Sequence, residues 1–64
     1  MTMIAVNSSA IAAVGYDGYT LSVQFTTSDT VYDHPGVPYS VYMDFMTAAS
    51  MGAYYNRYIR GRYL

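Results

Sequence analysis

Residues 11–25 read IAAVGYDGYTLSVQF, and this stretch predicts a β-hairpin. In its second half, aromatic and aliphatic side chains alternate with Thr, Ser and Gln, which is the pattern of a strand with one buried and one wetter face. We expect a first strand over Ile11–Tyr16, a type I′ turn at Asp17-Gly18 and a return strand over Tyr19–Phe25. Asp17 is therefore better explained by the turn than by catalysis.

Further short strands are expected on both sides of this hairpin. The apolar run Met3–Val6 is followed by the turn-prone cluster Asn7-Ser8-Ser9. After the hairpin, Thr26-Thr27-Ser28-Asp29 forms a turn, and Thr30–Asp33 forms another strand. The first half of the chain therefore predicts an antiparallel sheet of three or four strands.

A first helix is expected from Val37-Pro38 onward. Pro38 suits the first helical position, because the N–H that proline lacks has no partner there in any case. Apolar side chains then recur at helical spacing as far as Ala49, which core packing explains fully.

A second helix is expected from Ser50, a good N-cap residue, to Gly61, which suits the position just after a helix. Met51, Tyr55 and Ile59 repeat at i, i+4 and i+8 and should face the core. The expected fold is α+β: a small antiparallel sheet of three or four strands followed by two C-terminal helices, in a single domain over residues 1–64.

The composition predicts a homo-oligomer. A chain of 64 residues has an interior that supplies about 3–5 kcal/mol of net stability at most. It has no Cys for a disulfide and one His, so no metal site and no cofactor are expected. With 53% hydrophobic and 11% charged residues, the remaining means of stabilisation is assembly into a dimer or tetramer.

Charge and hydropathy narrow the possible partners. The chain has three Arg and four Asp, which gives a net charge of −1. So few cationic side chains cannot neutralise the phosphates of a long polyanion, so long nucleic acid is not an expected partner. No apolar span of 18 residues and no signal peptide is present, so no membrane partner is expected and the protein is expected to be cytoplasmic.

The last residues of the chain combine cations with aromatic rings. All the basic residues lie at or after Arg57, and four of the nine tyrosines lie in residues 50–64. On a helix, Asn56 and Arg60 would share one flank, while Arg57 would lie beside Tyr54 and Tyr58. This mixture suits a ligand that is both planar and anionic.

An enzyme is not expected. Asp33 and His34 invite comparison with a general-base pair, but adjacent residues on a strand point to opposite faces and cannot orient each other. No phosphate loop, carboxylate pair or Ser-His-acid set is evident. His34 could instead stack on a base or bond to one. Ser8 and Ser9 have two interpretations, as turn caps or as hydroxyl donors to a phosphate.

A family resemblance appears in several segments taken together. They are Ser50-x-Gly52-x-x-Tyr55-Asn56-x-x-Ile59-Arg60-x-x-Tyr63, preceded by Ser8-Ser9-x-Ile11, Gly15-Tyr16-Asp17 and Val37-Pro38. In this order and spacing they resemble the KTSC domain, named for a segment at the C-terminus of some lysyl-tRNA synthetases. Where that family usually has a lysine between the Ser and the Gly, this chain has Met51. The resemblance implies a small α+β module linked to nucleic acid or nucleotides.

The resemblance and the residues together favour a non-catalytic, oligomeric nucleotide-binding protein. Stand-alone KTSC-like proteins of this size are similar to phage proteins, which implies an anti-CBASS sponge that sequesters cyclic dinucleotides in the host cytoplasm. The alternatives are an accessory module for RNA or single-stranded nucleic acid, and a purely structural interaction module. The candidate ligand-binding residues are Ser8, Ser9, Tyr16, Tyr54, Asn56, Arg57, Tyr58, Arg60 and Arg62.

Overall fold

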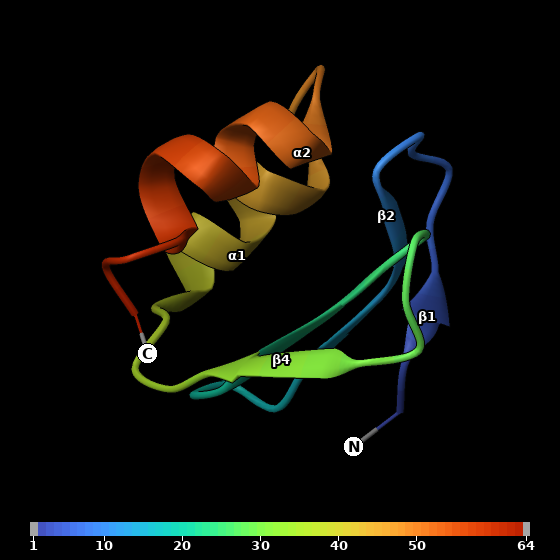
Figure 1. The fold of residues 1–64 in the computed structure, drawn as a ribbon. Coiled ribbons are helices and arrows are strands. Elements are labelled where there is room, and N and C mark those ends of the chain that lie inside the picture. Colours follow the sequence, from blue (N-terminus) through green and yellow to red (C-terminus); the bar gives the residue numbers. More distant parts are fainter. Residues whose placement is uncertain (1, 64) are drawn as a thin grey trace.

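A four-stranded antiparallel sheet carries two helical segments on one of its faces in the computed structural model, which describes residues 2–63 (Figure 1). The strands lie side by side in chain order: β1 (Ile4–Ala5), β2 (Ile11–Tyr16), β3 (Leu21–Phe25) and β4 (Val31–His34). Helix α1 (Tyr39–Met46) follows, and then α2 (Met51–Tyr54), which continues without a break as the π-helix η1 (Tyr55–Ile59). The predicted α+β fold, with its sheet followed by two C-terminal helices, is confirmed.

The central hairpin is confirmed, but its turn differs from the prediction. The return strand begins at Leu21, and Tyr19 is 64% exposed instead of lining the core. Gly18 has a φ of 95°, and no non-glycine residue in the described range has a positive φ. A type I′ turn at Asp17-Gly18 is therefore wrong, because it requires positive φ at both residues.

The Asp17 side chain holds this turn instead. Its Oδ1 accepts hydrogen bonds from the backbone N–H groups of Thr20 at 2.7 Å and Tyr19 at 2.9 Å. These donors favour the ionised carboxylate and hold the pKa of Asp17 below its ordinary value. The assignment of Asp17 to the turn rather than to chemistry agrees with this geometry.

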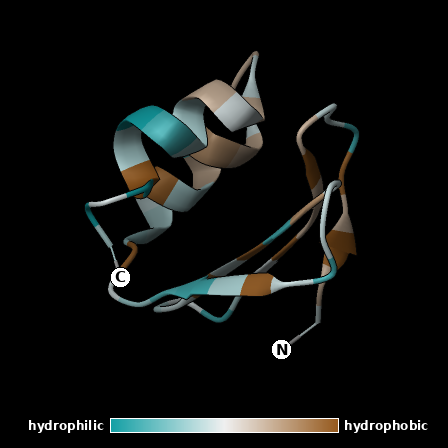
Figure 2. Ribbon diagram, in the orientation of Figure 1, coloured by the Kyte–Doolittle hydropathy of each residue, from teal (hydrophilic) through white to brown (hydrophobic). Residues whose placement is uncertain are grey.

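The core lies between the sheet and the helical layer. Figure 2 shows apolar residues along the strands and hydrophilic residues on the outer turn of the C-terminal helix. The buried apolar side chains are Ile11, Val14, Leu21, Val23, Val37, Phe45, Met51, Tyr55 and Ile59. Met51, Tyr55 and Ile59 are the three positions that the helical repeat predicted to face inward, so that prediction is confirmed.

Helix α1 is shorter than predicted at both ends. Pro38 is the N-cap and not the first helical residue, because its ψ of 156° is extended. At the other end, the backbone N–H and the hydroxyl of Thr47 both donate to the carbonyl of Met43, at 3.0 and 2.8 Å, and the helix ends there. Ala49 therefore lies outside the helix and is exposed, against the prediction.

The second helix begins as predicted and then changes character. The Ser50 hydroxyl accepts a hydrogen bond from the N–H of Ala53 at 3.3 Å, which confirms it as the N-cap. Near the end, the N–H of Arg60 donates to the carbonyl of Tyr55 at 2.8 Å, an i to i+5 bond that marks a π-helix. Gly61 follows with a φ of 80°, as a glycine after a helix should. Within residues 2–63, no helix has the length and apolar character needed to cross a membrane.

Candidate functional site

Seven of the nine predicted site residues are divided among three surface cavities. Ser8 and Ser9 line one, which we call the serine cavity, and Asn56 and Arg60 line a second, which we call the aromatic cavity. Tyr54, Arg57 and Tyr58 line the third, a shallower hollow of about 310 Å³. Tyr16 and Arg62 line none of these three cavities. The nine residues therefore do not form one site within a single chain.

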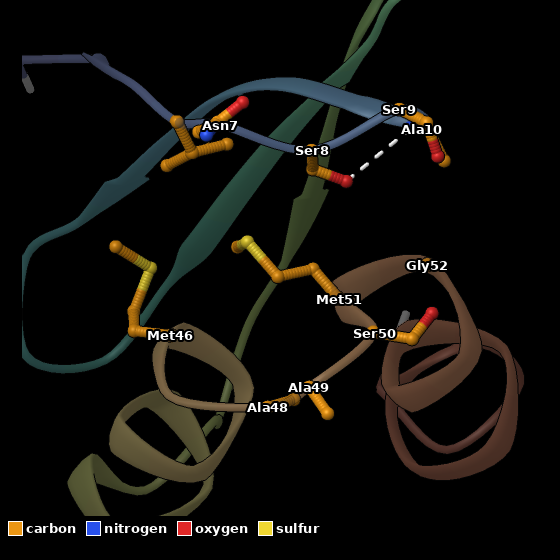
Figure 3. A pocket seen from close by; sticks show the side chains of 11 residues that line it. Asn7, Ser8, Ser9, Ala10, Met46, Ala48, Ala49, Ser50, Met51 and Gly52 are labelled. Atoms are coloured by element: carbon orange, nitrogen blue, oxygen red, sulfur yellow. Dashed lines mark hydrogen bonds between the residues drawn. The ribbon is translucent and has the colours of Figure 1, made fainter.

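The serine cavity lies between the β1–β2 loop and the turn that joins α1 to α2 (Figure 3). Its volume is about 500 Å³, and its lining is Val6, Asn7, Ser8, Ser9, Ala10, Met46, Ala48, Ala49, Ser50, Met51 and Gly52. Figure 3 shows the side chains of Met46 and Met51 extending toward the loop that carries Asn7 and Ser8. No charged side chain is among these residues. Since Met51 occupies the position where the family usually has lysine, this cavity holds no cation for a phosphate.

Ser8 caps the loop that borders this cavity. Its Oγ accepts hydrogen bonds from the N–H groups of Ala10 at 3.3 Å and Ile11 at 3.2 Å. Across the cavity entrance, a Cβ placed on Gly52 would lie 3.0 Å from the Cβ of Ala10. Such a distance is too short for an unstrained contact, so the helix approaches the loop closely only because residue 52 is glycine. The two hydrogen bonds that the Ser8 hydroxyl accepts confirm its turn-capping interpretation.

The aromatic cavity joins rings, hydroxyls and a guanidinium group. Its volume is about 540 Å³, and it is lined by Phe25, Thr27, Ser28, Tyr32, Tyr55, Asn56 and Arg60. These residues come from β3, the β3–β4 loop, β4 and η1, together with Arg60, which directly follows η1. The Phe25 ring meets those of Tyr55 and Tyr32 edge to face, with centroids 5.0 and 5.8 Å apart. Arg60 Nη1 lies 3.5 Å from Asn56 Oδ1, which confirms that these two side chains share a flank of the helix.

His34 lies beneath this cavity and belongs to the core. Its side chain is 7% exposed, and its Nδ1 lies 2.8 Å from the carbonyl oxygen of Tyr63. A carbonyl only accepts, so Nδ1 carries a proton; in the neutral imidazole, Nε2 then accepts from the Tyr55 hydroxyl at 2.8 Å. Both ring nitrogens are occupied, so the expectation that His34 could stack on or bond to a base is wrong. The ring is buried because β4 directs it under η1 and the C-terminal segment.

Asp33 points the other way, as expected for neighbours on a strand. Its Oδ1 accepts a hydrogen bond from the Ser22 hydroxyl at 2.6 Å, on the sheet face away from His34.

Burial raises the pKa of Tyr55 above its ordinary value, nearby Arg60 opposes the shift, and Tyr32 adds to it. The Tyr55 phenol is therefore protonated at neutral pH and can donate to His34.

The remaining predicted residues have separate environments. The Tyr16 hydroxyl donates to the carbonyl of Val37 at 2.6 Å, and its ring stacks on Tyr42 with centroids 4.3 Å apart. Tyr16 thus joins the sheet to the start of α1. Tyr54 and Tyr58 lie with centroids 4.6 Å apart on the opposite flank of the helix from Arg60, beside Arg57. Arg62 is exposed beyond Gly61.

Sequence reasoning missed five residues that line the aromatic cavity: Phe25, Thr27, Ser28, Tyr32 and Tyr55. The sequence predicts Thr27 and Ser28 only in a turn, Phe25 only at the end of the return strand, and Tyr55 only as a core position. Their polar and aromatic character is visible in the sequence. Their position opposite Arg60 depends on how the helix lies across the sheet, which no local pattern specifies.

Comparisons with known proteins agree with this architecture. The family model described as the KTSC domain matches residues 7–63. The crystal structure of a KTSC domain protein from Yersinia pestis is 34% identical to this chain, with a TM-score of 0.90, over 98% of this chain and 90% of that one. No curated protein matches. Because the family model spans nearly the whole chain and the solved structure shares its fold, this chain belongs to the KTSC domain family.

Proposed function

We propose that this chain is a non-catalytic nucleotide-binding protein and that the aromatic cavity is its site. In its most concrete form, the proposal is a phage anti-CBASS sponge that sequesters cyclic dinucleotides. The observation that carries the proposal is the presence of Arg60 and Asn56 beside the rings of Tyr32 and Tyr55 in one cavity of about 540 Å³. That volume lies within the range of about 300–1,000 Å³ typical of small-molecule sites.

The energetics of such a cavity suit a nucleotide. A base stacked on an aromatic ring contributes about 1–3 kcal/mol, and a hydrogen bond to a charged group about 1.5–3 kcal/mol. Nanomolar binding requires about 12 kcal/mol. One base stacked on the ring of Tyr32, which is 46% exposed, together with several bonds to guanidinium and hydroxyl groups, supplies a large part of that value. Thr27, which also lines the cavity, is a suitable hydroxyl donor to a phosphate oxygen.

The arrangement of charges supports a small ligand over a polymer. Arg60 lines the aromatic cavity, Arg57 lines the hollow on the other flank of the helix, and Arg62 lines neither. A protein that follows a nucleic-acid backbone needs cations along one groove. A module for RNA or single-stranded nucleic acid is therefore the less favoured alternative.

The environment of the titratable groups supports binding without turnover. His34 is buried with both ring nitrogens bonded, and Asp33 lies on the opposite face of the sheet. No group of three or more His, Cys, Asp or Glu side chains suited to a metal ion occurs within residues 2–63. The aromatic cavity itself is lined by no carboxylate or imidazole that would serve as a general base.

Isothermal titration calorimetry of an Arg60→Ala variant tests the proposal. The probes are GMP, cyclic di-GMP, 3′,3′-cyclic GMP-AMP and a short single-stranded RNA. Loss of one charge-assisted bond of about 1.5–3 kcal/mol should weaken nucleotide binding about 10- to 150-fold. The fold should be retained, because the guanidinium contacts Asn56 Oδ1 at the surface and caps no carbonyl in the described structure.

Arg62→Ala is the matched control, since it removes the same charge outside the aromatic cavity and should leave affinity within about twofold. Equal losses in the two variants would show that only net charge matters. Tight binding of the RNA with none to any of the three nucleotides would replace the proposal with the nucleic-acid module. An Arg60→Ala variant that unfolds would assign the residue a structural role.

A further inference from the structure

Strand β4 forms an open edge of the sheet. In Figure 1 it runs along the near edge, and β3 is its only strand neighbour within residues 2–63. Val31 and Tyr32 are 45% and 46% exposed, which is high for large apolar side chains. The strand contains no proline or lysine, the residues that commonly protect an edge from pairing with another chain.

The register shows which backbone groups of β4 are free. The N–H of Asp17 donates to the carbonyl of Thr20 across the hairpin, so by alternation the backbone of Leu21 and Val23 faces β4. Their partners His34 and Tyr32 therefore bond to β3. The N–H and C=O groups of Val31 and Asp33 point away from the sheet.

We infer that two copies of this chain join antiparallel through β4 and that the partner's Tyr32 completes the nucleotide site. This inference rests on the proposed function. A two-fold axis at Tyr32 places Val31 of each copy opposite the partner's Asp33, which makes four main-chain hydrogen bonds. An axis at Asp33 would instead place two carboxylates directly opposite each other, and such like-charge pairs are destabilising.

This pairing would unite the two aromatic cavities. The axis is perpendicular to a continuous eight-stranded sheet, so both helical layers lie on the same face. Tyr32 points to that face and lines the aromatic cavity, and it would stand directly opposite the partner's Tyr32, about 5 Å away between Cβ atoms. The joined cavities lie on either side of this pair of rings.

A single copy is an incomplete site for a cyclic dinucleotide. One aromatic cavity contains one guanidinium group, from Arg60, whereas the ligand has two phosphates. The paired cavities contain two, related by the same two-fold symmetry as a symmetric cyclic dinucleotide. A four-residue strand buries less than the roughly 1,200 Å² of a stable interface, so the bridging ligand should strengthen the dimer.

Analytical ultracentrifugation and calorimetry of a Val31→Pro variant test this inference. Proline at the first residue of an edge strand removes an outward N–H without removing a bond to β3. Val31→Thr is the matched control, because it keeps the N–H and the β-branched shape. We expect the wild type and Val31→Thr to bind cyclic di-GMP with one ligand per two chains and to dimerise with it. Val31→Pro should remain monomeric, keep its circular dichroism spectrum, lose at least tenfold in affinity for cyclic di-GMP and bind GMP as the wild type does.

Several outcomes separate this inference from the proposed function. One cyclic di-GMP per monomer, or a Val31→Pro variant that dimerises and binds like Val31→Thr, overturns the dimer while leaving nucleotide binding intact. Absence of binding to GMP and to both cyclic dinucleotides by the wild type defeats the proposed function, and the inference with it. Loss of the folded circular dichroism spectrum in Val31→Pro would contradict the outward-facing N–H of Val31 deduced from the register. In that case Tyr32→Ala tests the dimer instead, because it should abolish the binding of one cyclic di-GMP per two chains.

Discussion

The hydrogen bond between Tyr55 and His34 offers the sharpest test of the core beneath the aromatic cavity. Tyr55→Phe keeps the ring, and with it the edge-to-face contact with Phe25 at 5.0 Å, but removes the hydroxyl 2.8 Å from His34 Nε2. The imidazole is 7% exposed, so water cannot easily replace the lost partner. An unsatisfied buried acceptor costs about 1–3 kcal/mol. For a domain of this size, we expect the thermal midpoint to fall by about 4–8 °C for each kcal/mol lost.

Urea and thermal unfolding followed by far-UV circular dichroism measure this loss. Tyr58→Phe is the matched control, because its ring is 45% exposed and its hydroxyl forms no hydrogen bond within the described residues; its stability should change by less than about 0.5 kcal/mol. A His34→Leu/Tyr55→Phe double mutant should show a coupling energy of about 0.5–3 kcal/mol. If Tyr55→Phe is as stable as the wild type, or if Tyr58→Phe loses as much, the buried bond is not what joins β4 to the helix.

Four further predictions concern packing, pH, salt and turnover of the ligand. Gly52→Val should lose about 1–3 kcal/mol in urea unfolding, because even a Cβ at this position lies 3.0 Å from the Cβ of Ala10, whereas the exposed control Ala53→Val should lose less than about 0.5 kcal/mol. Burial raises the pKa of Tyr55, so the stability contributed by its neutral phenol is fully present below the unfolded-state pKa of about 10 and is lost as pH rises through the higher folded-state pKa. The urea midpoint of the wild type should therefore fall above pH 10, and that of Tyr55→Phe should fall less. Equal falls in the two proteins would contradict the raised pKa of Tyr55. Affinity for cyclic di-GMP should decrease only gently between 50 and 200 mM salt, unlike the losses of about 10³–10⁵ shown by proteins with many phosphate contacts. The ligand should be recovered chemically unchanged after denaturation; a linearised product would indicate a hydrolase.

Local patterns in the sequence were enough for most of the fold. Alternation identified the central hairpin, and helical spacing identified Met51, Tyr55 and Ile59 as core positions. Ser50 and Gly61 marked the ends of the second helix because caps depend on the chemistry of a few adjacent residues. These features are local, so they can be deduced without knowing the neighbours of each element.

The helix boundaries that were predicted wrongly are those where hydrogen bonds to residues distant in the sequence outweigh the local helix-capping preference. Two hydrogen bonds fix the backbone of Val37 outside the helix: its N–H donates to the carbonyl of Tyr19 at 2.9 Å, and its carbonyl accepts from the Tyr16 hydroxyl. Pro38 is therefore the N-cap, and the helix begins only after it. The i to i+5 bond from Arg60 to Tyr55 has no signature in the sequence. Such bonds depend on where the helix meets the sheet.

The candidate site was only partly visible in the sequence. A concentration of Arg and Tyr at the C-terminus predicted a surface for a planar anion, and helical spacing placed Asn56 beside Arg60. The tertiary structure decided that Arg57 lies on the other flank, that His34 is buried, and that the β3–β4 loop faces Arg60. The physical reason is that periodicity determines which side of an element is apolar, while the residues across from its polar side depend on the packing of helix against sheet.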